Sequence, residues 1–218
     1  MKIFFTLSFA LTGLVFFWTY SYAAWFSVFF SIIIVSAFYQ SRKHFLKTFF
    51  IITVLLFLVL FFQINTQKFS DLTNHPEKSS LASRIMIWNV AEKLALENPI
   101  SGIGPGNFQK EYLAAQPSFP PYLEWAVPQP HNLFLAFWLQ TGLIGLFGFV
   151  FLACNIFIFL LKKENKNSLD WVLFSFLLYT LIHGLVDTPF WKNDLSFLFW
   201  FFIAFFLLIK QKEKDFQK

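Results

Sequence analysis

The sequence has few charged residues and only one cysteine. Charged residues make up 13% of the 218 positions, whereas soluble domains carry roughly 25%. The single cysteine, Cys154, excludes an internal disulfide and any metal site built from several cysteines. These shortages exclude a soluble globular enzyme and a secreted domain held together by disulfides.

Apolar and aromatic residues dominate instead. Hydrophobic residues reach 57%, aromatic residues 22%, and the chain contains 35 phenylalanines. This composition excludes a disordered chain and predicts an all-α integral membrane protein, because a helix satisfies its own backbone hydrogen bonds in lipid. About 20 apolar residues span the hydrocarbon core. Six segments meet that requirement: 3–19, 22–39, 45–63, 132–161, 169–186 and 194–210.

Two of these segments need comment. The first apolar run also resembles a signal peptide, but it has no small-residue cleavage site and more apolar sequence follows at once. The fourth segment is longer than one span needs, so we expect it to tilt or to bend near Gly142, Gly145 or Gly148.

The basic residues predict the orientation. The net charge is +5, but the basic residues form short clusters between apolar runs rather than one basic face, which argues against a nucleic-acid partner. With six spans, most of them fall on one side, which the positive-inside rule makes cytoplasmic. Those residues are Lys2, Arg42, Lys43, Lys47, Lys162, Lys163, Lys166, Lys210, Lys212, Lys214 and Lys218. We therefore predict cytoplasmic termini.

The chain accordingly divides into four parts. Residues 1–63 and 132–210 each form three transmembrane helices, residues 64–131 form an outward loop, and residues 211–218 form a cytoplasmic tail. Acidic and basic residues nearly balance within the loop.

One amphipathic helix is expected in the loop, over residues 80–97. Serines at 79 and 80 can cap its start, and Asn98-Pro99 ends it. The spacing of Leu81, Ile85, Trp88, Ala91 and Ala95 places them on one face, which would lie against the outer leaflet or the transmembrane bundle.

Arg84 lies on that apolar side of the predicted helix. Its planar guanidinium suits a lipid phosphate or diphosphate. Alternatively, its aliphatic stem extends along the apolar surface and its head reaches the lipid headgroups.

A glycine-rich stretch follows the predicted helix. Gly102, Gly104, Gly106 and Asn107 resemble a phosphate-binding loop, but no strand precedes them and no Gly-Lys-Ser/Thr is present. The stretch is therefore either a structural turn that permits close backbone approach or a direct ligand contact.

The rest of the loop is aromatic and rich in proline. Trp125 and its neighbours suit stacking on sugar rings or anchoring at the membrane interface. His131-Asn132 stands at the start of the fourth span. Because imidazole exchanges protons near neutral pH, His131 is a candidate general base. It is equally compatible with a helix-start residue bonded to nearby backbone.

Two ionisable residues, His183 and Asp187, stand four positions apart near the outer end of the fifth span. Ionisable groups in a span are costly and therefore suggest function. A structural His–Asp pair is the simpler interpretation, and two ligands do not make a metal site.

The ordered motifs resemble the C-terminal half of the O-antigen ligase and O-antigen polymerase family of bacterial inner membranes. They are Ser83-Arg84 with Trp88, Asn98-Pro-Ile-x-Gly-x-Gly-x-Gly-Asn-Phe108, His131-Asn132-x-Phe-Leu135 and Thr141-Gly-Leu-Ile-Gly145. The resemblance implies a GT-C-like fold and glycan transfer from an undecaprenyl-diphosphate carrier to a hydroxyl of a glycolipid, a glycan or a protein. It implies no nucleotide sugar, no cofactor and no required metal.

Residue by residue, the resemblance implies that His131 is the catalytic base and that Arg84 engages the diphosphate. Asn132, Gly102, Gly104, Gly106, Asn107, Trp125, His183 and Asp187 are the expected substrate-binding residues. The sequence departs from the family pattern at Tyr22, where an arginine is frequent, and at Gln140, where a glutamate is common.

The family usually has about ten to twelve spans, so the chain is expected to be a fragment, a split protein or a shortened homologue. Two alternatives to an independent enzyme follow. One is a non-catalytic or half-protein that needs an N-terminal partner. The other, weaker one is a small proton-coupled transporter that uses His183 and Asp187.

Overall fold

The computed structural model describes residues 2–121, 123–162, 167–191 and 193–216. Within these ranges the chain is helical and contains no strand. The helices are α1 (Lys2–Trp18), α2 (Tyr22–Tyr39), α3 (Arg42–Phe61), α4 (Gln67–Asn74), α5 (Ser80–Glu97), α6 (Phe108–Ala115), α7 (Leu133–Lys162), α8 (Ser168–Gly184) and α9 (Asn193–Phe216). Short 3-10 helices cover Pro76–Lys78 and Gln116–Ser118.

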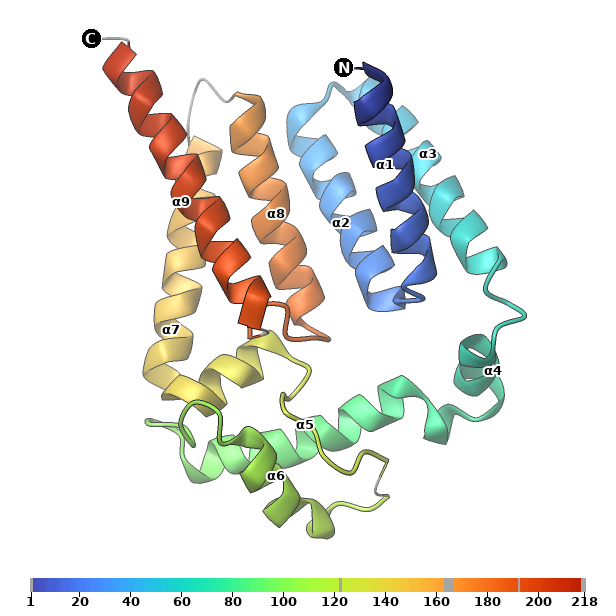
Figure 1. The fold of residues 1–218 in the computed structure, drawn as a ribbon, viewed down its shortest axis with the longest axis vertical. Coiled ribbons are helices and arrows are strands. Elements are labelled where there is room, and N and C mark those ends of the chain that lie inside the picture. The colour runs from blue at the N-terminus through green and yellow to red at the C-terminus, as the bar shows by residue number, and fades with distance from the viewer. Residues whose placement is uncertain (1, 122, 163–166, 192, 217–218) are drawn as a thin grey trace.

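The helices form a bundle with a layer across one end (Figure 1). α1, α2, α3, α8, α9 and most of α7 run along the long axis, whereas α5 and α6 lie across the end opposite the start of α1 and the end of α9. α2 packs beside α3 and α8. All six apolar segments predicted from sequence are helical, with close boundaries. α4 and α6 are helices of the loop that the sequence interpretation did not predict.

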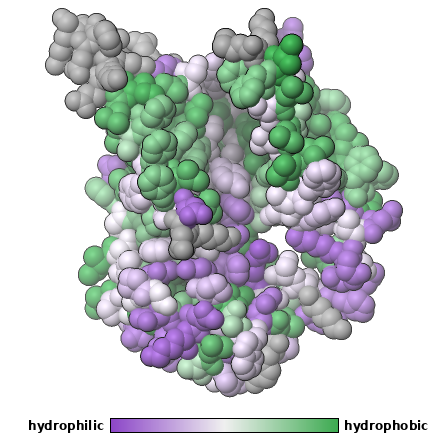
Figure 2. Space-filling model, viewed as in Figure 1, coloured by the Kyte–Doolittle hydropathy of each residue, from purple (hydrophilic) through white to green (hydrophobic). Residues whose placement is uncertain are grey.

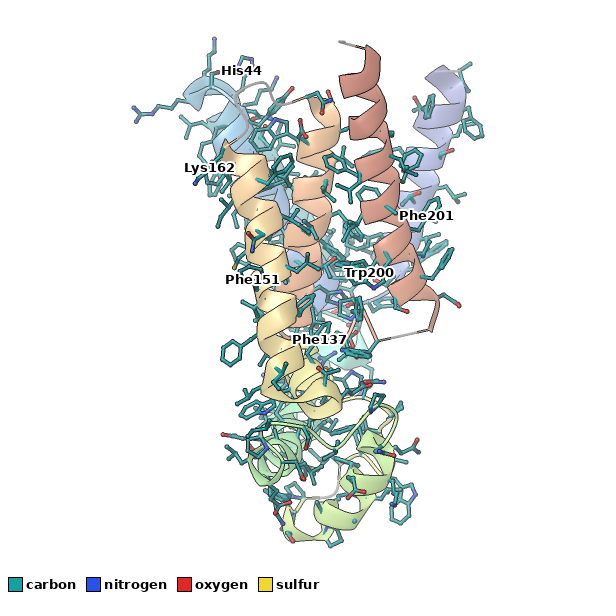
Figure 3. All side chains as sticks on the ribbon, turned by 90° about the vertical axis from the view of Figure 1, so that its left-hand side faces the viewer. His44, Phe137, Phe151, Lys162, Trp200 and Phe201 are labelled. Carbon is teal, nitrogen blue, oxygen red and sulfur yellow. The ribbon has the colours of Figure 1, made fainter. Side chains whose placement is uncertain are left out.

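The outer surfaces of the bundle are apolar. α2, α3 and α7 are long and apolar enough to cross a membrane, and three shorter apolar helices cover Ile3–Trp18, Ser168–Gly184 and Asp194–Ile209. No residue of α3 is buried, and Phe151 points away from the bundle (Figure 3). Exposed apolar area on this scale requires nonpolar surroundings. The chain is a membrane protein.

Hydrophilic residues gather over the end layer, while the bundle is mostly hydrophobic on the face drawn in Figure 2. Each part has its own core. One core lies among α7, α8 and α9 and includes Leu133, Phe137, Leu177 and Phe199. The other joins α5, α6 and the start of α7, and it includes Ile87, Val90, Phe108, Tyr112 and Leu139. The first turns of α7 therefore belong to both cores.

α7 bends at Gly142, one of the three glycines near which the length of this segment predicted a bend as an alternative to a tilt. Gly142 has φ +69° and ψ −176° inside the helix. The bend folds the first turns back, so that the Phe137 ring stacks on Phe149 with centroids 4.1 Å apart. An added Cβ on Gly142 would lie 1.7 Å from the Ile100 carbonyl oxygen. Glycine is needed here both for its positive φ and for the close approach.

The predicted limits of α5 are confirmed, and its predicted apolar face is buried in its second half, at Ala91 and Ala95, but not at Leu81 and Ile85. The Ser79 hydroxyl accepts a hydrogen bond from Ala82 N at 3.2 Å, and the helix ends before Asn98-Pro99. Leu81 and Ile85 are each 48% exposed. The buried residues are Ser83, Met86, Ile87, Val90, Ala91, Leu94 and Ala95. α6 and the bent start of α7 cover a side of α5 that includes Ala91 and Ala95 together with Met86, Ile87, Val90 and Leu94.

Candidate functional site

His131 occupies the turn that leads into α7. Its φ of +48° is in the left-handed region, which is uncommon for a residue with a Cβ. The Asn132 side-chain oxygen accepts hydrogen bonds from Phe134 N and Leu135 N, each at 3.0 Å. The Asn132 amide nitrogen donates to the Leu185 carbonyl at 2.9 Å. Asn132 thus caps α7 and ties its start to the end of α8.

The imidazole of His131 contacts a carboxylate from the end of α8. Its Nδ1 lies 3.1 Å from Asp187 Oδ1, and the two side chains are 34% and 18% exposed. The His183–Asp187 pair predicted from the i, i+4 spacing is present, with His183 Nε2 4.0 Å from Asp187 Oδ2. His183 Nδ1 is within 3.2 Å of the Tyr179 hydroxyl. Asp187 thus lies closer to His131, which precedes α7, than to His183 of α8.

A glycine allows these two helix ends to meet. An added Cβ on Gly184 would approach Leu133 Cδ2 to 2.7 Å and Leu133 Cβ to 2.8 Å. Leu133 is fully buried at the first position of α7. Because Gly184 has no side chain, the start of α7 can pack against α8 closely enough to bring His131 to Asp187.

A cavity of about 510 Å³ lies among α2, α3, α4, α5 and α8. Its wall contains two cations, Lys68 from α4 and Arg84 from α5, and no acidic residue among those described. Most of the remaining wall is apolar and includes Phe26, Phe30, Leu60, Phe69, Leu72, Leu81, Ile182, Leu185 and Val186. An anionic head with a hydrocarbon tail matches this distribution of charge.

The two cations have different surroundings. Arg84 Nε is buried and has no hydrogen-bond partner within the described ranges. Lys68 Nζ donates to the Tyr20 carbonyl oxygen and lies 5.1 Å from the centroid of the Tyr22 ring. Burial, and secondly the nearby Arg84 charge, lower the pKa of Lys68 below its usual value. Lys68 was not predicted from the sequence, because nothing local to a single lysine in a loop of nearly balanced charge shows that it lies near Arg84.

Neither His131 nor Asp187 lines this cavity, but each is linked to its wall through a neighbouring residue. Trp88 follows Arg84 by one helical turn on α5, and its indole nitrogen donates to the His131 carbonyl at 3.2 Å. On the α8 side, Val186 lines the cavity and immediately precedes Asp187. Asp187 lines a different cavity, of about 230 Å³, together with Tyr179, His183 and Phe190.

The glycine-rich stretch packs against the bend of α7. Ile103 N donates to the Leu139 carbonyl at 2.7 Å, and an added Cβ on Gly102 would lie 2.3 Å from that same oxygen. These contacts favour the structural-turn interpretation for Gly102. Gly104, Gly106 and Asn107 do not line the cavity, and Asn107 Nδ2 donates to the Ile103 carbonyl at 2.8 Å.

Two other sequence features have clear positions. Trp125 is 81% exposed and available to a ligand outside the cavity. Gln140 is buried, and its amide nitrogen donates to Gln129 Oε1 at 3.2 Å. Among the described residues, no three His, Cys, Asp or Glu side chains are close enough to hold a metal ion.

The family model described as O-antigen ligase matches residues 7–150. The match confirms the family resemblance drawn from the motifs and includes Arg84 and His131, whereas Asp187 lies beyond it. Comparison with curated proteins gives no match, nor does comparison with solved structures.

Proposed function

Because the chain belongs to the O-antigen ligase family, we propose that it transfers or polymerises glycans from an undecaprenyl-diphosphate donor to a hydroxyl acceptor. The family supports lipid-linked glycan transfer in a membrane. The donor, the acceptor and the roles of individual residues are the proposal. The reaction takes place on the outer face of the bacterial inner membrane, in the layer formed by residues 64–131.

His131 acts as the general base. Its Nδ1 donates a hydrogen bond to Asp187, so that Nε2 accepts the proton of the acceptor hydroxyl. The acceptor oxygen forms a bond to the anomeric carbon of the donor sugar, and the bond from that carbon to the diphosphate oxygen breaks. The proton remains on His131, where the Asp187 carboxylate stabilises the imidazolium.

Arg84 stabilises the leaving group. Cleavage of the sugar–diphosphate bond leaves additional negative charge on the lipid diphosphate. The guanidinium in the cavity wall offsets this charge, and the apolar wall accommodates the first part of the lipid chain. The exposed Trp125 stacks on the donor or acceptor glycan outside the cavity.

The proposed topology has six spans and cytoplasmic termini. His44 and Lys162 lie at the end of the bundle opposite α5 and α6 (Figure 3). This arrangement supports a basic cytoplasmic end and an outward layer. Three of the six helices are shorter than 18 residues in their apolar part, which favours local thinning of the bilayer around them.

The observation that carries the proposal is that His131 Nδ1 lies 3.1 Å from Asp187, whose chain neighbour Val186 lines a cavity with Lys68 and Arg84 as its only described charged wall residues. To test it, the source bacterium would carry His131→Ala in place of the natural chain, and glycan transfer would be measured in its membranes. We expect transfer to fall by about 10²-fold or more, because a general base typically contributes that much.

His75→Ala is the matched control. His75 lies in the same outward loop, is exposed, and has Nδ1 3.5 Å from Glu77 Oε1, away from the cavity. This variant should keep full transfer. Undiminished transfer by a His131→Ala protein present at normal levels in the membrane would refute the proposed role of His131.

A further inference from the structure

Lys68 and Arg84 bring two positive charges to one cavity wall from different helices. Neither side chain forms a salt bridge with an acidic residue in the described part of the chain. Like charges near each other in a largely apolar cavity raise the free energy of the empty site. A ligand with two linked phosphates would place a negative group on each cation and remove that cost.

Lys68 is held in place without being neutralised. Its ammonium donates to the Tyr20 carbonyl oxygen and lies over the Tyr22 ring. Both partners are uncharged groups that attract a cation without neutralising its charge. They therefore position the charge at the wall and leave it available to an anion.

The two cations differ in how they bind phosphate. A guanidinium binds two oxygens of one phosphate through a planar fork, whereas an ammonium acts as a compact point charge. Arg84 Nε is buried and has no partner among the described residues. One phosphate on Arg84 leaves Lys68 unsatisfied, and a second linked phosphate would satisfy it.

The rest of the cavity limits the ligand to a lipid. The surface in Figure 2 is hollowed where the apolar helices meet the hydrophilic layer. Phe26, Phe30 and Leu60 in the wall belong to α2 and α3. A ligand would therefore place its anionic head beside Lys68 and Arg84 and its hydrocarbon chain between apolar helices.

We propose that Lys68 is a specificity-determining residue that, with Arg84, selects a polyprenyl diphosphate over a polyprenyl monophosphate. The proposal rests on the proposed function, since it concerns the headgroup of the donor. Arg84 binds one phosphate and Lys68 binds the other. Removal of Lys68 therefore weakens the binding of the diphosphate more than that of the monophosphate.

The test measures binding rather than transfer. The full chain would be placed in phosphatidylcholine nanodiscs, and the dissociation constants of undecaprenyl diphosphate and undecaprenyl monophosphate would be compared. We expect Lys68→Gln to lower diphosphate affinity about tenfold or more, the range for a lost charged hydrogen bond, while monophosphate affinity changes little. Lys68→Arg should keep most of the preference for diphosphate.

Lys93→Gln is the control for loss of a lysine. Lys93 lies on α5, outside the cavity, with Nζ 4.0 Å from Glu97 Oε1. This variant should bind both lipids normally. An unchanged ratio of the two affinities in Lys68→Gln would overturn the inference, as would an equal loss of both affinities.

A second arm separates the donor lipid from ordinary phospholipid headgroups. In nanodiscs of phosphatidylglycerol, diphosphate binding should persist, because each phosphatidylglycerol carries one phosphate. Complete displacement by phosphatidylglycerol would instead make this a general headgroup site. If Lys68→Gln leaves the ratio of the two affinities unchanged while His131→Ala loses transfer, only the role of Lys68 is overturned. Normal transfer in His131→Ala would instead overturn the proposed function.

Discussion

His131 Nδ1 lies 3.1 Å from Asp187 Oδ1, although the two residues are 56 positions apart in the chain. His131 precedes α7 and Asp187 follows α8, so the contact depends on how these helix ends pack. Gly184 permits this packing against Leu133. A carboxylate on one imidazole nitrogen fixes the ring and leaves the other nitrogen for proton transfer.

We expect Asp187→Asn to lower glycan transfer by about 10²-fold, since an amide stabilises the imidazolium of His131 far less than a carboxylate does. Initial rates in membranes containing equal amounts of protein would measure this. His183→Gln is the comparison, because His183 Nε2 is 4.0 Å from Asp187 Oδ2. Its loss should stay within about threefold. Proton-coupled uptake that disappears in Asp187→Asn would favour the transporter hypothesis instead.

The bend of α7 gives a prediction about stability. Gly142→Ala places a Cβ 1.7 Å from the Ile100 carbonyl oxygen at a φ of +69°. We expect it to lower the free energy of unfolding by more than about 2 kcal/mol, because both the clash and the backbone strain must be relieved.

Gly148→Ala in the same helix is the matched control. Nothing lies within 4 Å of the position that its Cβ would take. Helix propensity alone predicts a gain of about 0.5–1 kcal/mol. Thermal unfolding of both variants in detergent would measure the difference, and similar melting temperatures would contradict the tight contact at Gly142.

The lowered pKa of Lys68 predicts the pH dependence of diphosphate binding. The ammonium is lost as the pH rises through its pKa, and burial together with Arg84 lowers that pKa below 10.5. As the pH rises, binding of undecaprenyl diphosphate should therefore begin to weaken at a lower pH than it would if Lys68 had the pKa of an ordinary lysine. Affinities measured at rising alkaline pH in nanodiscs would locate this loss.

Two variants identify the group that titrates. Lys68→Arg should abolish the alkaline loss, because arginine stays charged. Tyr22→Phe should retain it, since the ring remains under the ammonium while the phenol is gone. Arg84 is the charged group from another helix that acts on Lys68, and Asp71 on α4 accepts a hydrogen bond from Gln67 at 2.6 Å. An alkaline loss in Lys68→Arg would contradict the assignment.

The orientation in the membrane is testable with two cysteine variants in a Cys154→Ala background. Lys110 in α6 has a side chain that is 84% exposed, and His44 is exposed at the opposite end of the bundle (Figure 3). A membrane-impermeant maleimide should label Lys110→Cys in spheroplasts and His44→Cys only after lysis. The reverse labelling pattern would invert the proposed topology.

The sequence predicted the helices of the bundle well. Segments 22–39 and 80–97 coincide with α2 and α5, because apolar runs and caps are local signals that act within a few residues. It did not predict α4 or α6, which are short and polar. The helix α4 matters for the candidate site because it carries Lys68.

The bend of α7 was partly predictable. The length of the apolar run, with three glycines, predicted a tilt or a bend near one of them. The choice of Gly142 depends on the loop at Ile100, which packs against the helix there. No local pattern distinguishes Gly142 from Gly148.

By itself, the sequence determined a helical membrane protein, and it pointed to Arg84 and His131. Only the tertiary structure decided that Asp187 contacts His131 more closely than His183, that α5 buries Met86, Ile87 and Val90 while Leu81 and Ile85 stay exposed, and that Lys68 shares a cavity with Arg84. The physical reason is the range of the interactions. Hydrophobic period and capping operate between neighbours in the chain, whereas these three outcomes depend on which helix ends and faces pack together.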